Sequence, residues 1–316
     1  MECPAMRRAP DVWWKSIRTA IAAGVFATAM TACAPYQVVD VPSTNQSSRV
    51  DYVVVHFTSE NYAESMRLLT QPSLNPVSSH YLIPEQDDET YPREAPVIHR
   101  LVPELRRAWH AGRSNWAGAD SLNDRSIGIE LVNVSRCAPG VPDANVFRAL
   151  EAACRFEAFD ATQIELLVTL MRDLLERYPG IDPVDVVGHS DIAPQRKTDP
   201  GPLFPWQQLY DAGIGAWYDD DTRARYREAF RQSPPSVTTI QTALAAYGYP
   251  IEVSGVMGIP ERNVIRAFQM HFTPDNATGA ADIETVSTLF ALLEKYRPDT
   301  LAELGDLAPD VPAASP

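Results

Sequence analysis

The sequence predicts an α/β fold followed by a small all-α domain. Segments of strand length, rich in apolar and β-branched residues, occur at 51–57, 126–133 and 184–188, and an amphipathic helix spans 160–178. Strands interleaved with a long helix are typical of an α/β core. Residues 236–297 show only helical spacing, which predicts three short helices packed around a few aromatic side chains.

The first 32 residues are expected to be an export signal and not part of the fold. They combine a cationic start with a short apolar run, the pattern of a signal peptide. The run MTAC that ends in Cys33 resembles the lipobox of bacterial lipoproteins, whose cysteine is acylated and becomes the first residue. The resemblance implies a lipidated Cys33 on a tether at 33–49, and Ala34 in the next position implies the outer membrane, facing the periplasm. The alternative is an ordinary signal cleaved after Ala29, which would release a soluble periplasmic protein.

The strands differ in how they are expected to be buried. The run DYVVVHF at 51–57 is apolar and β-branched almost throughout, as in a strand buried on both faces. In SIGIELVN at 126–133, alternate residues are apolar and share one face, so that Glu130 lies on the other face. The short strand at 184–188 leads directly into His189.

The helix at 160–178 has clear start and stop signals. Asp160 is its N-cap, and Gln163 completes a capping box. Pro179 and Gly180 end it. The apolar stripe that predicts its buried face consists of Ile164, Leu167, Val168, Met171, Leu174, Leu175 and Tyr178.

The α/β pattern stops near residue 210. We interpret residues 211–235, which end in Ser-Pro-Pro, as a linker to the helical domain at 236–297. Residues 298–316 are rich in Pro, Ala and Asp and contain no basic residue, which predicts a disordered tail. We expect the α/β part to fold and act without the helical domain, because His56, His189 and Asp199 all precede the linker.

Charge excludes two classes of protein from the expected functions. The chain has 27 Lys and Arg against 41 Asp and Glu, a net charge of −14. A surface this acidic does not favour phosphate backbones, so we expect no nucleic-acid binding. No apolar run reaches the roughly 18 residues that a membrane-spanning helix needs, so we expect no multi-span membrane protein.

Cysteine usage fits an oxidising compartment. Once Cys3 is removed with the signal and Cys33 carries lipid, Cys137 and Cys154 remain as one possible disulfide pair. The alternative is that both are buried thiols. A catalytic cysteine is not expected, because neither lies in a basic, histidine-rich segment.

Two of the six histidines end predicted strands. His56 closes the first strand and His189 follows the strand at 184–188, with Lys197 and Asp199 in the same run. Hydrolytic zinc sites are built from two imidazoles and one carboxylate, with a coordination position left for water. The pattern therefore favours a zinc hydrolase, although a single histidine at a strand end is more often structural.

Five segments together resemble a known family, the zinc-dependent N-acetylmuramoyl-L-alanine amidases of the type 2 amidase family, whose fold is shared with peptidoglycan recognition proteins. The resemblance covers about residues 50–210 and implies a mixed central sheet flanked by helices. Within this family, the chain resembles in particular the envelope lipoprotein branch of Gram-negative bacteria, whose members carry a C-terminal peptidoglycan-binding module. IQTALAAYGYPI and VIRAFQMHF resemble that module, but GVMGIPERN replaces its usual Gly-x-Gly-Thr loop. The five segments are HFTSE (56–60), SSHYLI (78–83), RAWHAG (107–112), NDRSIGIELVN (123–133) and GHSDIAPQRKTDPGPLFPW (188–206).

The resemblance implies a role for each residue that matches the family's motifs. His56, His189 and Asp199 would bind Zn²⁺. Glu130 falls where the family has its catalytic carboxylate, a general acid and base. Lys197 falls where it has a cation that stabilises the developing oxyanion. The alternatives are a solvated strand residue for Glu130 and a surface cation for Lys197.

Further residues of these motifs are candidates for the substrate cleft. His110 falls where the family has a cleft histidine, and Tyr81 and Trp109 are candidates for the cleft wall, as are His80 and Trp116. Core packing is the alternative for these side chains. Asp191 is expected either to orient a ligand histidine or to cap the turn that follows it, and His99 and His271 are expected to be ordinary.

The implied activity is hydrolysis of the amide between N-acetylmuramic acid and L-alanine, in peptidoglycan or muropeptides, during cell-wall turnover and recycling. The alternative is a non-catalytic muropeptide-binding protein on the same fold. Recognition proteins that lose activity usually lose a metal ligand, and all three ligands are present here. An endopeptidase that cuts within the stem peptide is a third possibility.

Overall fold

A computed structural model describes residues 39–138 and 153–304 of the chain. The chain consists of two units, 1–46 and 47–316. Residues 39–46 of the first unit form no helix or strand. The expected signal peptide at 1–32 and the expected lipid on Cys33 lie outside the described residues. Within the described ranges, every helix is too short or too polar to cross a bilayer.

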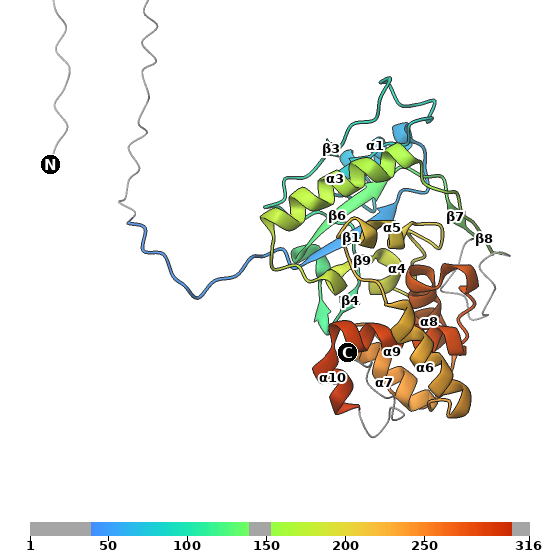
Figure 1. Cartoon of the computed structure of the whole chain (residues 1–316). Helices are drawn as coiled ribbons and strands as arrows, with labels where there is room; N and C mark the ends of the chain where they lie inside the picture. The colour runs from blue at the N-terminus through green and yellow to red at the C-terminus, as the bar shows by residue number, and fades with distance from the viewer. Residues whose placement is uncertain (1–38, 139–152, 305–316) are drawn as a thin grey trace, which may run out of the picture. The chain divides into compact units, whose positions relative to one another are not determined.

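A five-stranded mixed sheet forms the centre of the second unit (Figure 1). Its order is β3 (His99–Arg100), β2 (Tyr81–Ile83), β6 (Ser126–Leu131), β1 (Tyr52–Phe57) and β9 (Val186–Gly188). The strands β2, β6, β1 and β9 are parallel to their neighbours, and only β3 is antiparallel, on the edge. This confirms the α/β class and the mixed sheet.

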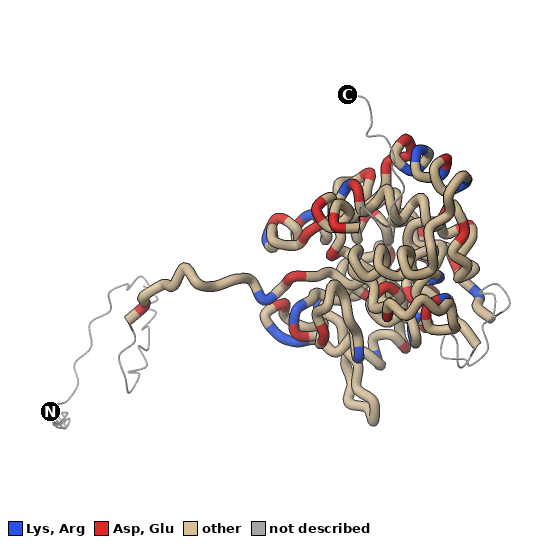
Figure 2. Tube along the Cα trace, turned by 90° about the horizontal axis from the view of Figure 1, so that it is seen from below, with Lys and Arg blue, Asp and Glu red and all other residues tan. Residues whose placement is uncertain are grey.

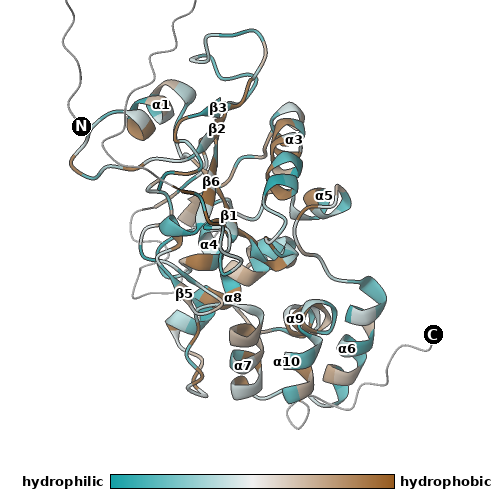
Figure 3. Ribbon diagram, turned by 90° about the vertical axis from the view of Figure 1, so that its left-hand side faces the viewer, coloured by the Kyte–Doolittle hydropathy of each residue, from teal (hydrophilic) through white to brown (hydrophobic). Residues whose placement is uncertain are grey.

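Two helices cover opposite faces of this sheet (Figure 3). Helix α3 (Ala161–Arg177) packs on the face that carries Ile83, and helix α1 (Tyr62–Thr70) packs on the face that carries Leu82. Asp160 caps α3 as expected, by accepting a hydrogen bond from the Gln163 amide at 2.7 Å. The Gln163 side chain then donates to two carbonyls at the sheet, which fixes α3 over it.

Short elements complete the α/β part. They are the hairpin β4 (Asn115–Trp116) and β5 (Ala119–Asp120), the antiparallel pair β7 (Arg136–Cys137) and β8 (Cys154–Arg155), the 3₁₀ turns η1 (Leu122–Asp124) and η2 (Pro183–Asp185), and the helices α4 (His189–Ile192) and α5 (Trp206–Asp211). Cys137 and Cys154 face each other across the pair β7–β8 and are joined by a disulfide.

The helical part is larger than expected. It comprises α6 (Asp220–Gln232), α7 (Val237–Tyr247), α8 (Ile259–Phe272), the turn η3 (Pro274–Asn276), α9 (Ile283–Tyr296) and α10 (Pro298–Glu303). The linker expected at 211–235 is wrong, because α6 lies in it and buries Tyr226 and Phe230 against Phe290 of α9. The disordered tail expected at 298–316 is wrong over its first residues, which form α10 and bury Leu304; residues 305–316 lie outside the described part.

The α/β and helical parts share one hydrophobic core. Trp116 of β4 is 1% exposed and packs edge-on against Tyr249, 4.9 Å away between ring centroids. The Ala117 amide donates to the Gly248 carbonyl at 2.8 Å. Trp206 stacks on His271 of α8. The helical domain therefore packs into the core of the α/β part, which argues against the expectation that the α/β part folds independently of it.

Both signs of charge are spread along the second unit (Figure 2). Most ion pairs join residues at its surface, such as Arg125 with Asp51 and Arg107 with Asp124. Exposed pairs of this kind contribute little to stability, so burial of the shared core is the main stabilising term.

Candidate metal centre

The ends of three adjacent parallel strands bring the candidate residues together. His56 near the end of β1 lies directly opposite Glu130 near the end of β6. On the other side of β1, strand β9 ends at Gly188, so that His189 begins α4 at the same edge. Ligand sites of parallel sheets lie at this carboxyl edge. The loop that follows returns Asp199 to it, and the Ser190 amide donates to the Asp199 carbonyl at 2.8 Å.

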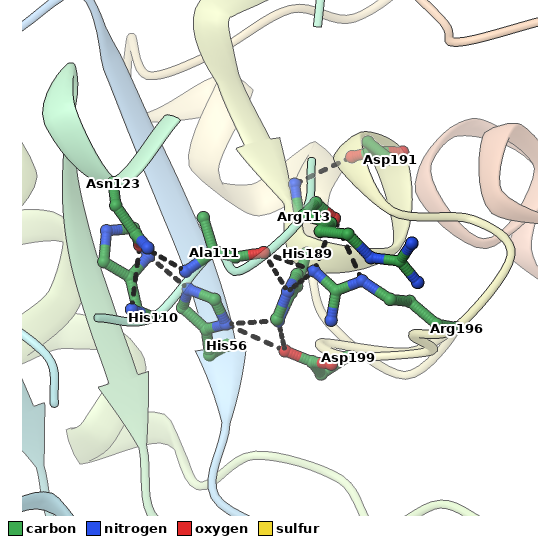
Figure 4. A network of polar contacts seen from close by, with 10 residues as sticks. His56, His110, Ala111, Arg113, Asn123, His189, Asp191, Arg196 and Asp199 are labelled. Atoms are coloured by element: carbon green, nitrogen blue, oxygen red, sulfur yellow. Dashed lines mark hydrogen bonds and ion pairs between the residues drawn. The ribbon is translucent and has the colours of Figure 1, made fainter. Parts of the chain in front are cut away.

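Three side-chain atoms converge on one point of this edge (Figure 4). His56 Nδ1 lies 2.9 Å from His189 Nδ1 and 2.9 Å from Asp199 Oδ2, and His189 Nδ1 lies 3.1 Å from Asp199 Oδ2. All three residues are buried, with exposures of 1%, 3% and 6%. The three candidate metal ligands therefore form a closed triangle of donor atoms.

The proton on His56 is fixed by a chain of hydrogen bonds behind it. Ser126 Oγ donates its only proton to the Leu122 carbonyl at 2.6 Å, so it must accept from His110 Nε2 at 3.1 Å. Neutral His110 then has a bare Nδ1, which accepts from His56 Nε2 at 3.0 Å. The lone pair of His56 Nδ1 is left facing the triangle.

The proton on His189 is fixed in the same way from another direction. His189 Nε2 lies 3.1 Å from the Ala111 carbonyl, which can only accept, so Nε2 carries the proton. Arg196 Nη2 also donates to this carbonyl and lies 3.3 Å from the same nitrogen, a longer contact. His189 Nδ1 therefore also presents a lone pair to the triangle.

This arrangement fits a metal ion. Two imidazole lone pairs and a carboxylate that face one another at about 3 Å repel each other unless a cation lies among them. Nitrogen and oxygen donors from two histidines and one aspartate are a zinc donor set, with ligand distances of about 2.0–2.2 Å. Both histidines also have their distal nitrogens hydrogen-bonded, which is the usual support of metal-binding imidazoles.

Electrostatics favours the protonation states that a metal requires. Burial lowers the pKa of His189 to about 4, so its imidazole is neutral near pH 7. Burial would raise the pKa of Asp199, but His189 and His56 outweigh it and hold this pKa well below its ordinary value. Neutral imidazoles and an ionised carboxylate are the metal-binding forms.

Glu130 and Lys197 line a cavity of about 190 Å³ above the triangle. The Glu130 Oε2 atom is shielded from solvent and has no hydrogen-bond partner among the described residues. Burial raises the pKa of Glu130, against the opposing effect of His56. A carboxyl with a raised pKa and an unpaired oxygen beside a metal site is equipped to accept and return a proton.

The candidates for the substrate cleft divide into two groups. Trp109 lines the cavity and is 50% exposed, so it is available to a ligand. His110 reaches the cavity but is 7% exposed and holds His56, so its main contacts are those of a supporting residue.

Tyr81, His80 and Trp116 are not part of the cavity lining, and we correct these predictions. Tyr81 points into the core and its hydroxyl donates to Glu104. His80 bridges the Gly128 amide and the Arg106 carbonyl. Trp116 is buried against the helical domain. Their rings pack in the protein interior, as the alternative of core packing predicts.

Sequence reasoning missed the residues that orient the ligands. Asn123 Oδ1 accepts from the His110 and Ala111 amides at 3.0 and 2.8 Å, and it thereby fixes the segment behind both histidines. Ser126 fixes the tautomer of His110. The available signal was two polar residues at the start of an apolar strand, Asn123 just before it and Ser126 as its first residue.

Two sequence families match the chain. Residues 46–202 match the N-acetylmuramoyl-L-alanine amidase family, and residues 233–289 match a peptidoglycan-binding domain. The chain is 43% identical over 253 residues to the N-acetylmuramoyl-L-alanine amidase AmiD of Escherichia coli, a match that covers 79% of this chain and 85% of AmiD.

Two solved structures of complexes with anhydromuramyl peptides are similar to this structure. AmpDh3 of Pseudomonas aeruginosa in complex with anhydromuramic pentapeptide is 42% identical, with a TM-score of 0.74, and the match covers 83% of this chain and 99% of AmpDh3. The complex of E. coli AmiD with the substrate anhydro-N-acetylmuramic acid-L-Ala-D-γ-Glu-L-Lys is 41% identical, with a TM-score of 0.68, and covers 83% and 96%.

Proposed function

Because this chain belongs to the N-acetylmuramoyl-L-alanine amidase family, we propose that it hydrolyses the amide between N-acetylmuramic acid and L-alanine with a zinc ion held by His56, His189 and Asp199. The observation that carries the proposal is the triangle of donor atoms, in which both histidines present a lone pair and Asp199 a carboxylate. A zinc ion there would act as a Lewis acid toward the scissile carbonyl and toward water.

Glu130 moves the proton in this proposal. Its unpaired Oε2 takes a proton from the attacking water and delivers it to the amide nitrogen of L-alanine as the C–N bond breaks. Burial raises the pKa of Glu130, which favours the protonated form that the second half of the transfer requires.

Lys197 and Trp109 act on the substrate. The Lys197 ammonium lines the cavity next to the triangle, where a cation stabilises the oxyanion that develops on the carbonyl. The exposed indole of Trp109 offers a flat apolar wall beside Leu68 and Val77, suited to the face of a sugar ring.

We further propose muropeptides as substrates and peptidoglycan as the partner of the helical domain. The relatives with bound ligands hold anhydromuramyl peptides, and the match to a peptidoglycan-binding domain falls on the helical part. Residues 50–210 would form the catalytic domain and 236–297 the binding module. The role would be cell-wall turnover and recycling.

Location is a separate proposal that depends on the lipobox-like run at Cys33. Acylation there would hold the enzyme at the outer membrane, facing the periplasm, on the segment 33–49. Wild type and Cys33→Ala should be fractionated and their mature N-termini determined by mass spectrometry. Membrane-bound wild type and soluble Cys33→Ala are expected. A soluble wild type that begins at Met30 would instead support the ordinary signal.

The amidase proposal is tested by metal analysis and product identification. Purified protein should contain about one zinc per chain, and digestion of sacculi and of anhydro-muropeptides should release free stem peptides that begin with L-alanine. His189→Ala should lose both the zinc and the activity. Bound muropeptide without release of peptide would favour the non-catalytic alternative, and cleavage within the stem peptide would favour an endopeptidase.

A further inference from the structure

A buried carboxylate, Asp191, lies directly behind the metal centre. It belongs to α4, the short helix that begins with His189, and it is 0% exposed. Its Oδ2 accepts from the Gly188 amide at 2.7 Å and from His271 Nδ1 at 2.8 Å, and its Oδ1 accepts from the Tyr249 hydroxyl at 2.7 Å. A carboxylate this buried requires such partners, because an unpaired charge in the interior is strongly unfavourable.

Two of these three donors come from the helical domain. His271 lies near the end of α8, and Tyr249 follows α7. The His271 ring is fixed by stacking on Trp206, with centroids 3.8 Å apart and an interplanar angle of 15°. Tyr249 is 3% exposed and packs against Trp116. Both donors are thus held rigidly by rings of the catalytic domain.

The third donor links Asp191 to the metal ligand. Gly188 directly precedes His189. The hydrogen bond from the Gly188 amide to Asp191 therefore caps the turn that carries this metal ligand. There is little room for this turn to shift, because a Cβ on Gly188 would lie 2.6 Å from Pro200 Cδ, the residue after Asp199. The position of Asp191 is therefore coupled to the positions of His189 and Asp199.

We infer that Tyr249 and His271 are positioning residues for the metal centre, which the helical domain completes by holding Asp191. The inference rests on the proposed metal site. It gives this domain a second task, distinct from binding peptidoglycan: it supports the ligand geometry of the active site. Outer-shell partners of metal ligands typically change metal affinity by about 10- to 100-fold, and we expect these residues to act near the lower end of that range.

A matched pair of tyrosines separates positioning from packing. Tyr249→Phe removes the hydroxyl that donates to Asp191. Tyr247→Phe removes a buried hydroxyl that has no hydrogen-bond partner among the described residues, on a ring 6.2 Å away. In metal-stripped full-length protein, zinc affinity is measured by competition with a chromophoric chelator. Tyr249→Phe should weaken it by about 10-fold, and Tyr247→Phe should leave it unchanged.

A second pair tests His271 in the same assay. His271→Phe keeps a ring that stacks on Trp206 but loses the donor, whereas His271→Asn keeps a donor in place of Nδ1 but loses the ring. We expect His271→Phe to weaken zinc binding and to change the visible spectrum of the cobalt-substituted protein. We expect His271→Asn to lower the melting temperature and to retain more of the zinc affinity than His271→Phe does.

The outcomes separate this inference from the proposed function. If the parent chain binds no zinc, the metal site itself is wrong. If the parent binds zinc and Tyr249→Phe binds it equally well with an unchanged cobalt spectrum, the positioning role is wrong. Equal weakening by Tyr247→Phe would also overturn it, because packing alone would then explain the effect. The tyrosine pair decides the question even if His271→Phe fails to fold.

Discussion

At the scale of single residues, the proposed mechanism depends on Glu130 being able to exchange a proton. Glu130→Gln keeps the shape of the side chain but removes this ability. Because Glu130 is not one of the three ligands in the triangle, zinc content should be retained. Turnover of a soluble muropeptide should fall by about 10² or more, the usual scale of general acid and base catalysis.

The control for this prediction is metal content, measured on the same preparation as the activity. Loss of zinc together with activity would mean that Glu130 supports the ligands rather than the chemistry. A nearly normal rate would reduce Glu130 to an ordinary residue of β6.

The residue scale also shows where sequence reasoning succeeds and where it stops. His56 and His189 were predicted because they end predicted strands, and Asp199 because it follows His189 in the same run. The roles of Glu130 and Lys197 were predicted from the resemblance to the amidase family. The tautomers of the two histidines were not predictable. They depend on Ser126, His110 and the Ala111 carbonyl, which are brought to the site by folding and not by neighbouring positions in the chain.

At the scale of elements, Asp185, in the turn before β9, holds the β4–β5 hairpin, and its burial is expected to make the stability of the fold depend on pH. Trp116 Nε1 donates to Asp185 Oδ1 at 3.2 Å. Burial raises the pKa of Asp185 from 3.8 to about 6, with Arg297 opposing. The folded state therefore favours the protonated acid, so the stability that this group contributes is fully present below about pH 4 and is lost as the pH rises through about 6.

Asp185→Asn should remove this dependence, since asparagine is neutral and retains an oxygen for Trp116. The melting temperature of the variant relative to the parent should rise between about pH 4 and pH 7. Thermal unfolding at several pH values in this window measures it. A difference that is constant across the window would show that Asp185 titrates equally in the folded and unfolded chain.

Elements with strong periodicity were predictable, and those that depend on docking were not. The apolar strands and α3 carry their own signals, including the Asp160 cap. Helix α6 was missed because its sequence, DDTRARYREAFRQ, is charged on most faces and buries only Tyr226 and Phe230. Two apolar residues four positions apart are too weak a pattern to identify a helix without the partner, α9, that covers them.

At the scale of the whole molecule, the two domains pack as one compact unit with a shared core rather than as an enzyme on a tether. His271 and Asp191 lie 80 positions apart in the sequence, and only the docking of α8 on α4 brings them together. A tethered module would act through effective concentration alone. A shared core adds direct structural support, so loss of the module should affect every substrate.

Truncation before Ser236 tests this difference. The shortened chain would expose the apolar surfaces of Trp116 and Trp206 and would leave α6 without α9, with Phe230 and Tyr226 uncovered. It would also remove two of the three donors to Asp191. We expect a large fall in melting temperature and a loss of activity on soluble muropeptides as well as on sacculi. A chain that ends after Leu304 keeps α6 to α10 and serves as the control.

The two interpretations of the helical domain predict different effects of the truncation on activity toward soluble and insoluble substrates. If the domain only grips peptidoglycan, the truncated enzyme should keep its rate on a small muropeptide and lose rate only on insoluble sacculi. If the domain completes the core and holds Asp191, both rates should fall together, and so should zinc affinity. A truncated chain that remains folded, zinc-loaded and fully active on the soluble substrate would show that the buried contacts between the two domains are dispensable.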